Sequence, residues 1–253
     1  MHLLDCLTIP TDSDVWGKRI PNAQGELYYR DNGADVLAVA HLDSVLWARP
    51  RMKGDIVRCP QLDDRLGVWV LLNVLPRLGV KVDILLTDCE EIGQSTADFF
   101  HPQKEYNWMV EFDRKGTDVV MYDYDCDEYA DMMWAANFAP SWGTWSDICH
   151  LDHLGVAGFN IGTGYHNEHT RGCYADLEDT LSQAELFAEF WKQYRGDCLP
   201  APTLDTADDT ADDTADDTAD DTGWWEIEQR ARYYGYENTE DFIFEGGLQL
   251  LGC

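Results

Sequence analysis

The stretch "VDILLTDCEE" (Val82–Glu91) joins an apolar run to two adjacent glutamates. The run predicts a buried β-strand over Val82–Asp88. Adjacent side chains of a strand point to opposite faces. At least one of two carboxylates directly after a buried strand should therefore have a function. The pair therefore indicates that this strand ends in a functional site.

Similar apolar runs recur through the first 200 residues and alternate with segments of helical pattern. The predicted strands are Glu26–Arg30, Asp35–His41, Asp55–Cys59, Val82–Asp88, Trp108–Asp113, Asp118–Tyr124 and Val156–Gly162. The predicted helices are Arg65–Leu78, Thr96–Phe100, Asp127–Phe138, Ser146–Leu154 and Leu177–Arg195. Near-continuous Val, Ile and Leu runs separated by helices indicate a sheet covered on both faces. The predicted fold class is α/β, with a mixed, largely parallel central sheet.

The composition divides the chain after residue 200. Residues 206–221 repeat the unit TADD four times, without aromatic or large apolar groups, so residues 201–222 are predicted to form an acidic, disordered linker. Residues 223–253 regain apolar content and are predicted to form a small helical module with an unknown partner. Residues 1–200 remain as the main domain.

The net charge limits the classes of partner. The 253 residues carry a formal charge of -30, and residues 201–253 hold 15 Asp and Glu against 2 Arg, which leaves -17 for the first 200 residues. Such a field disfavours nucleic acid and anionic membrane surfaces, because both are polyanions. A cationic partner fits this charge better.

The sequence also carries signals about compartment. It has no run of 18 apolar residues, and its first residues lack the basic and apolar regions of a signal peptide. The eight cysteines are scattered, without a CxxC pair, which indicates reduced thiols. These features predict a cytoplasmic protein that neither crosses nor binds a membrane.

Carboxylates and imidazoles follow five of the predicted strands, at the edge where an open α/β sheet binds ligands. They are His41, Asp43, Asp63, Asp64, Glu90, Glu91, Asp113, His166 and His169. One such group is most often a cap, but five converging strand ends would bring repelling carboxylates together unless a cation compensates them. Mixed imidazole and carboxylate donors suit Zn, Co or Mn better than Mg or Ca. The sequence therefore predicts a pair of divalent metal ions, most simply zinc.

The motifs "HLD", "LDDRLG", "CEEIG", "EFD" and "HT" occur in this order between residues 25 and 187. Each motif is weak alone, but their order resembles that of the co-catalytic di-zinc exopeptidases, which include peptidase-T-like tripeptidases and leucyl-type aminopeptidases. The resemblance implies the zinc-exopeptidase fold, also described as phosphorylase/hydrolase-like. It makes residues 1–200 the catalytic domain.

The resemblance also implies a role for each matching residue. The implied metal ligands are His41, Asp63, Glu91, Asp113 and His169. Asp63 would bridge the two ions, with Asp64 in a position that is often linked by a cis peptide bond. Asp43 would orient His41 from behind. Glu90 would act as general base.

The last ligand is open between two histidines of "GYHNEHT" (Gly164–Thr170). The following sequence resembles the peptidase-T-like ending from His169 onward, which favours His169 over His166. The family usually has an acidic residue four places later, where this chain has Cys173.

A lid or dimerisation insertion of the tripeptidases is also missing, because only 55 residues separate Asp113 from His169. The substrate pocket should then come from the loops at residues 138–147 and 162–168. Tyr165 or His166 could stabilise the oxyanion there.

The predicted function is hydrolysis of a peptide bond, most simply by an aminopeptidase acting on short peptides through a metal-activated water. An alternative on the same scaffold is a deacylase or amidohydrolase that acts on an acylated amino acid or a small amide. A second alternative is an inactive scaffold that only binds, against which the intact set of six residues, the five ligands and Glu90, argues.

Overall fold

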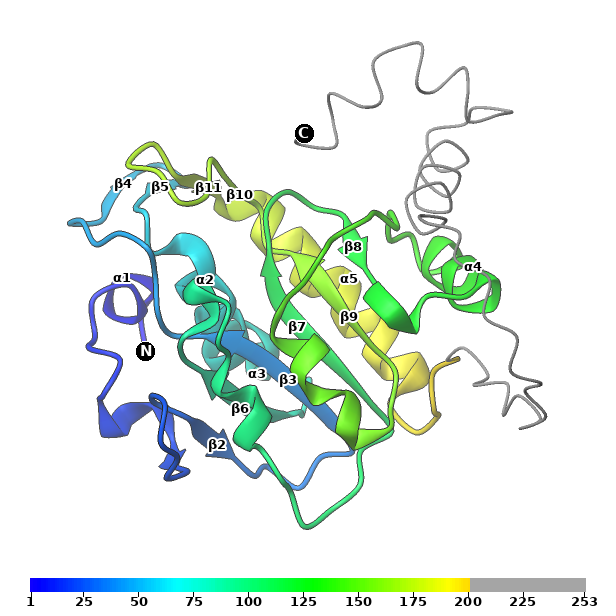
Figure 1. The fold of residues 1–253 in the computed structure, drawn as a ribbon. Coiled ribbons are helices and arrows are strands. Elements are labelled where there is room, and N and C mark those ends of the chain that lie inside the picture. Colours follow the sequence, from blue (N-terminus) through cyan, green and yellow to red (C-terminus); the bar gives the residue numbers. More distant parts are fainter. Residues whose placement is uncertain (201–253) are drawn as a thin grey trace, which may run out of the picture. The chain divides into compact units, whose positions relative to one another are not determined.

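The computed structural model describes residues 1–200, and a seven-stranded sheet forms their centre (Figure 1). Its strands are β1 (Lys18–Arg19), β2 (Tyr28–Arg30), β3 (Val36–His41), β6 (Asp83–Thr87), β7 (Trp108–Arg114), β8 (Val119–Val120) and β9 (Gly158–Gly162). They lie in the order β1-β2-β6-β3-β7-β9-β8. The inner pairs β6–β3, β3–β7 and β7–β9 are parallel, and the outer pairs are antiparallel. The predicted α/β class with a mixed, largely parallel sheet is confirmed.

Helices cover both faces of this sheet (Figure 1). One face packs against α2 (Leu62–Trp69), the π-helical turn η2 (Val70–Val74), α3 (Leu75–Arg77), α4 (Asp127–Ala135) and α5 (Leu177–Tyr194). The other packs against two 3-10 helices, η4 (Thr96–Phe99) and η6 (Asp147–Leu154). Along β3, Val36 and Ala38 face the first layer, whereas Leu37 and Val39 face the second, as alternation requires. A strand buried on both faces is therefore apolar along most of its length, here from Val36 to Ala40.

The remaining helical turns of the described residues are short. They are α1 (Leu3–Cys6), η1 (Asp14–Trp16), η3 (Glu90–Ile92) and η5 (Tyr122–Tyr124). The strand predicted over Asp118–Tyr124 is wrong in its second half, because the chain leaves β8 after Val120 and turns into η5. The α2 span starts at Leu62, but Asp63 and Asp64 have non-helical backbone angles, so the regular helix begins at Arg65, as predicted, and runs through η2 to the end of α3.

A second, antiparallel sheet lies beside the first. It comprises β10 (Tyr165–His166), β11 (Tyr174–Asp176), β5 (Ile56–Arg58) and β4 (Arg51–Lys53), in that order. The strand predicted over Asp55–Cys59 belongs here, so the expectation that five strands of one sheet converge is wrong for this segment. Three paired residues are too few for a pattern to indicate which sheet they join. Asp63 consequently reaches the site from the start of α2.

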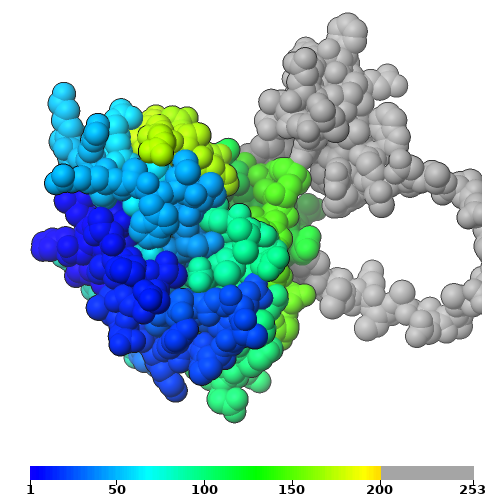
Figure 2. Space-filling view, turned by 60° about the vertical axis from the view of Figure 1, so that its left-hand side comes forward, coloured from blue at the N-terminus to red at the C-terminus, as the bar shows by residue number. Residues whose placement is uncertain are grey.

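A buried arginine fixes the start of α2. The guanidinium of Arg65 is fully buried and donates hydrogen bonds to the carbonyl oxygens of Leu42 (2.5 Å), Cys6 (3.2 Å) and Ile9 (3.0 Å). These bonds satisfy a charge that would otherwise be costly to bury. They tie the N-terminal segment, drawn in blue in Figure 2, and the end of β3 to the helix that carries Asp63.

The glycine of "DDRLG" is required by close packing. A Cβ atom at Gly67 would lie 1.9 Å from the carbonyl oxygen of Phe112 in β7, which is backbone that cannot move aside. Only glycine therefore lets α2 approach β7 so closely. The approach brings the start of α2 to the end of β7.

Two other expectations can be compared with the described residues. Their cysteines are all free thiols, and the predicted reducing environment stays a prediction. None of their helices is long and apolar enough to cross a membrane. The predicted linker (residues 201–222) and helical module (residues 223–253) lie outside the described residues.

Candidate metal centre

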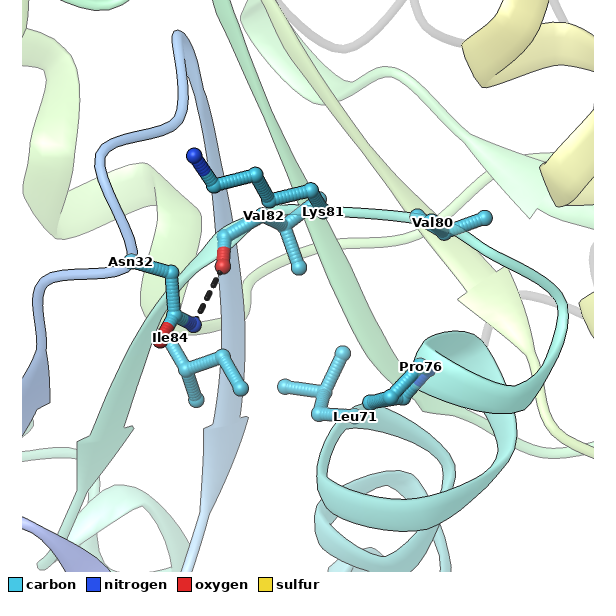
Figure 3. Close-up of a pocket in the computed structure, with 7 residues that line it drawn as sticks. All are labelled: Asn32, Leu71, Pro76, Val80, Lys81, Val82 and Ile84. Atoms are coloured by element: carbon cyan, nitrogen blue, oxygen red, sulfur yellow. Dashed lines mark hydrogen bonds between the residues drawn. The ribbon is translucent and has the colours of Figure 1, made fainter.

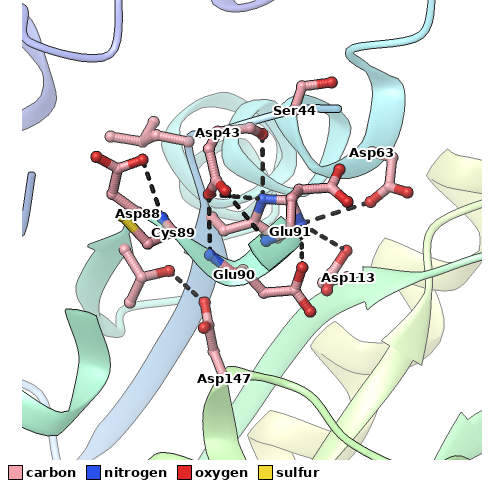
Figure 4. A network of polar contacts seen from close by, with 12 residues as sticks. Asp43, Ser44, Asp63, Asp88, Cys89, Glu90, Glu91, Asp113 and Asp147 are labelled. Carbon is pink, nitrogen blue, oxygen red and sulfur yellow. Dashed lines mark hydrogen bonds and ion pairs between the residues drawn. The ribbon is translucent and has the colours of Figure 1, made fainter. Parts of the chain in front are cut away.

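Three neighbouring strands bring polar side chains to the carboxyl edge of the central sheet (Figure 4). His41 is the last residue of β3, and Asp113 lies near the end of β7. After β6 the chain turns at Cys89, whose φ of 66° is in the left-handed region, and enters η3 with Glu90 and Glu91. Parallel neighbours end at the same edge, so these side chains meet.

The imidazole of His41 lies at the centre of the cluster and is fully buried. Its Nε2 is 3.4 Å from Asp63 Oδ1, 3.3 Å from Asp113 Oδ1 and 3.8 Å from Glu90 Oε2. Its Nδ1 faces the other way, 3.4 Å from Asp43 Oδ1 and 3.2 Å from the Asp43 carbonyl oxygen. The ring is therefore held so that Nε2 points into the carboxylates.

Asp43 also positions the glutamate pair. Its carboxylate accepts hydrogen bonds from the backbone N–H groups of Glu90 (3.3 Å) and Glu91 (3.1 Å). One side chain thus fixes both an imidazole and the start of η3. Asp43 lies behind the cluster, which suits the orienting role that the resemblance implies.

Asp63 stands between two imidazoles. The peptide bond from Asp63 to Asp64 is cis. Asp63 Oδ1 faces His41 Nε2 at 3.4 Å, and Oδ2 faces His169 Nε2 at 3.2 Å. His169 Nε2 also lies 2.9 Å from Glu91 Oε2. The two oxygens of one carboxylate therefore serve two separate groups of donors.

The two candidate histidines of the last motif are separated by the structure. His169 reaches the cluster from a turn, with φ at 56° and 55% of its side chain exposed. His166 lies on β10, and its ring packs against Tyr174 at a centroid distance of 5.2 Å. Cys173, where the family usually has an acid, is buried in the small core under β10 and β11. It contributes packing and no charge.

Two acidic residues of the cluster are missing from the residues singled out in the sequence. Glu111 of β7 is fully buried and accepts hydrogen bonds from the N–H groups of Asp147 and Ile148, both at 3.3 Å. Asp147, also fully buried, accepts a hydrogen bond from the hydroxyl of Thr87. Glu111 could have been found, because residues two apart on a strand share a face and Asp113 is already a candidate.

A side-chain amide holds Asp113 at an irregularity of β7, where the pairing with β9 shifts register. Asn160 Oδ1 accepts from the Asp113 N–H (2.9 Å), and Asn160 Nδ2 donates to the Asp113 carbonyl oxygen (3.1 Å). Asn160 thereby replaces the missing ladder bonds. The carboxylate of Asp113 is free to face His41.

Burial and mutual repulsion shift the protonation of the cluster. Burial, reinforced by neighbouring carboxylates, raises the pKa of Glu90 to about 9 and that of Asp113 to about 7, although His41 opposes both shifts. The pKa of Asp63 moves down instead, because hydrogen bonds from His169 and His41 outweigh its burial. The nearby histidines therefore do not balance the negative charge of all the carboxylates in this cluster.

The donor set fits divalent ions. Donor atoms of His41, Glu90 and Asp113 lie within 4.8 Å of one another, and so do those of His41, Asp63 and Glu91. Within the described residues, His41 Nε2 makes no hydrogen bond although carboxylates surround it. A buried nitrogen that faces several oxygens without bonding to any of them is suited to share a cation with them. Imidazole with carboxylate favours Zn, Co or Mn.

A separate hollow lies at the opposite end of β6 (Figure 3). Its lining is mostly apolar, and the amide of Asn32 is already used by a 2.7 Å hydrogen bond to the carbonyl oxygen of Val82. Lys81 is its one ionisable lining residue. This hollow therefore adds no second cluster of ionisable groups.

Comparison with solved structures defines the class of fold. A tripeptidase from Staphylococcus aureus aligns over 76% of this chain and 96% of its own, with a TM-score of 0.58 and 10% identity. An aminopeptidase from the archaeon Desulfurococcus kamchatkensis aligns over 76% of this chain and 88% of its own, with a TM-score of 0.55 and 12% identity. The dodecameric PhTET1-12s aligns over 74% and 99%, with a TM-score of 0.51 and 14% identity.

The chain has the fold of these structures, and the fold expected from the order of its motifs is confirmed. No protein-family model matches the chain, and no curated protein matches it in sequence. At such low identity the likeness defines the fold, whereas the activity must be argued from the site.

Proposed function

We propose that this chain is a metal-dependent peptidase, an aminopeptidase that acts on short peptides. The observation that carries the proposal is the placement of Asp63, whose two oxygens face His41 and His169 from opposite sides. The similarity of the fold to tripeptidase and aminopeptidase structures supports the same class of reaction. The predicted cytoplasmic location and a partner for residues 223–253 stay predictions.

The residues present would hold two ions. His41, Asp63 and Asp113 form one donor group, and Asp63, Glu91 and His169 form the other. Two divalent ions bound here would supply polarisation of a substrate carbonyl and a lowered pKa for a water molecule. Zinc is the first choice, with cobalt or manganese as alternatives.

Glu90 is assigned the proton transfer. Its backbone N–H is fixed by Asp43, while its carboxylate projects beside His41 at 3.8 Å. Burial raises its pKa to about 9, and positive charge beside it would favour the carboxylate form. Glu90 would then take a proton from water and give it to the leaving amine.

The surroundings suit a substrate with a charged amino terminus and an apolar first side chain. Val45 and Ile92 flank Glu91 and are 48% and 66% exposed. The N–H of Val45 donates to Glu91 Oε1 at 3.3 Å, so the two apolar groups stand at the rim of the cluster. The acidic charge of residues 1–200 would attract an ammonium group.

The test is substrate profiling after metal loading. The full chain, reconstituted with zinc or cobalt, is assayed with aminoacyl reporters and with matched N-acyl reporters. Preferential release from the aminoacyl series supports the aminopeptidase, whereas preferential release from the N-acyl series would establish the deacylase alternative. Fewer than about one bound metal per chain would favour the binding scaffold.

A further inference from the structure

The hydroxyl of Tyr165 lies inside the metal-binding cluster. It is 3.2 Å from Asp63 Oδ1 and 3.3 Å from Asp113 Oδ1. The side chain is only 3% exposed and packs in the small core with Val57 and Cys173. Its hydroxyl oxygen therefore shares the space into which His41 Nε2 points.

The second sheet and the loop after β7 fix this tyrosine in place. Tyr165 pairs with Ala175 of β11, which pairs in turn with Val57 of β5. Its carbonyl oxygen accepts a 2.8 Å hydrogen bond from the N–H of Gly116. The backbone of Tyr165 is thus held by the second sheet and by the loop after β7, and its buried ring carries the hydroxyl to the cluster.

The two contacts are long for hydrogen bonds from a hydroxyl to a carboxylate, which are about 2.5–2.7 Å. Two other tyrosines of this chain allow a comparison of hydroxyl–carboxylate distances. The hydroxyls of Tyr29 and Tyr106 lie 2.7 and 3.0 Å from Asp83 Oδ2. The single hydrogen of the Tyr165 hydroxyl is shared between the carboxylates of Asp63 and Asp113. The Tyr165 hydroxyl instead lies at nearly equal, longer distances from the two carboxylates.

Four distances around this hydroxyl do match edges of a metal coordination tetrahedron. With bonds of about 2.0–2.1 Å, two ligand atoms of tetrahedral zinc lie about 3.3–3.4 Å apart. The oxygens of Asp63 and Asp113 lie 3.4 and 3.3 Å from His41 Nε2, and 3.2 and 3.3 Å from the Tyr165 hydroxyl. Four of the six distances among this nitrogen, the two carboxylate oxygens and the hydroxyl oxygen therefore agree with the spacing of a four-atom donor set.

We propose that the Tyr165 hydroxyl oxygen is a fourth ligand of the ion held by His41, Asp63 and Asp113. This inference rests on the proposed function, which places an ion there. On binding, a bond forms between oxygen and metal, the phenolic O–H bond breaks, and its proton leaves to solvent. The assignment removes Tyr165 from the two candidates for oxyanion stabilisation and leaves His166.

The same assignment makes the two metal positions unequal. The position at His41 is buried and gains a phenolate, whereas the position at His169 depends on an imidazole that is 55% exposed. Negative charge and exclusion of water both strengthen cation binding. The first zinc should therefore bind at the tyrosine side, and the second should bind more weakly and exchange faster.

The experiment is a zinc titration of the full chain, followed by near-ultraviolet difference absorbance and by equilibrium dialysis. We expect one tyrosinate equivalent to appear with the first zinc and none with the second. Tyr165→Phe should abolish this band and weaken the first zinc by about tenfold or more, as loss of a direct ligand should. The second zinc should change by less than about threefold.

Tyr106→Phe is the matched control, because it removes a hydroxyl from a buried carboxylate at the other end of β6. It should keep the band and both affinities. Wild-type chain that binds two zinc ions and cleaves peptide without a tyrosinate band would overturn this inference and leave the proposed function standing.

A Tyr165→Phe variant with unchanged zinc affinity but a lowered kcat would also overturn the inference, by assigning the hydroxyl to the oxyanion. Chain that binds no zinc would overturn both proposals. The wild-type titration decides the question even where the variant misfolds.

Discussion

Strand β6 has a buried carboxylate at its start and leads to a cluster of carboxylates after its end. At the start, Asp83 is fully buried, and the protein supplies every donor that it needs. The donors are the N–H groups of Asn32 (2.8 Å) and Ala34 (3.0 Å), the hydroxyls of Tyr29 (2.7 Å) and Tyr106 (3.0 Å), and the ammonium of Lys104 (2.8 Å). Asp83 is a structural acid.

At the other end of β6, the protein supplies too few hydrogen-bond donors for the carboxylates of the cluster. Asp64 Oδ2 and Asp147 Oδ1 are buried and make no hydrogen bond within the described residues. The pKa values point the same way: that of Asp83 is lowered, because Lys104 and Tyr29 outweigh its burial, whereas that of Glu90 is raised to about 9 by burial. A carboxylate satisfied by the chain stabilises the fold, whereas a cluster left short of donors is built for a cation.

Among the substitutions at the two ends of β6, the largest expected effect is on turnover. Glu90→Gln should lower kcat by about 10³–10⁴-fold, because the amide cannot accept the proton of water. Zinc content should stay at the wild-type value, since Glu90 is not assigned as a ligand. Steady-state kinetics and metal analysis of the same preparation check both points.

Asp83→Asn makes the same change, carboxylate to amide, at the other end of β6 and is the control for this variant. It should leave kcat within about twofold of the wild-type value. Loss of zinc from Glu90→Gln with unchanged kcat per bound metal would reverse the assignments of Glu90 and Glu91.

Metal removal should have the next largest effect, on stability. Zinc at a thousand times its dissociation constant should raise the free energy of unfolding by about 4 kcal/mol, because it binds the folded chain. Asp63→Asn should lose most of this gain, since both donor groups include Asp63. Urea unfolding with zinc and with a chelator measures the difference, and equal midpoints would contradict a metal centre.

Asp83→Asn itself should destabilise the fold by about 2–4 kcal/mol at neutral pH, because Lys104 loses its buried partner. The folded-state pKa of Asp83 lies below its ordinary value, so its contribution is fully present above about pH 4 and is lost as the pH falls through the folded-state value. The stability gap between variant and wild type should therefore shrink below about pH 4. Urea titrations across this range would show a constant gap if Asp83 does not act through its charge.

Tyr106→Phe should give the smallest effect. It removes one of five donors to Asp83 and should cost about 0.5–1.5 kcal/mol, with no change in zinc affinity or kcat. Thermal unfolding and zinc dialysis measure both quantities. A larger loss than that of Asp83→Asn would mean that the ring, rather than its hydroxyl, stabilises this end of the sheet.

Much of the fold could be predicted because the central strands are apolar at most of their positions. The runs that became β3, β6, β7 and β9 are buried on both faces, and such runs stand out in a sequence. The short strands β1, β4, β10 and β11 were not predicted, because two or three residues cannot show a period. Their pairing depends on partners far away in the chain.

The candidate site likewise contains residues that the sequence indicated and residues that it did not. The order of the motifs identified His41, Asp63, Glu90, Glu91 and Asp113 as a set, since each lies beside a local signal such as a strand end or a glycine. Asp147 carried no such signal, and Glu111 was indicated only by its place two residues before Asp113. They meet only because η6 starts above β7, which is a contact between segments 36 residues apart.

The sequence by itself determined which residue types stand at the strand ends, and their charges predicted a cation. Only the tertiary structure decided that His169 rather than His166 faces Asp63, and that the Tyr165 hydroxyl lies against Asp63 and Asp113. Strand patterns depend on nearest neighbours and on burial, both of which leave a local trace in the sequence. Distances between atoms of separate loops depend on the packing of two sheets, which leaves none.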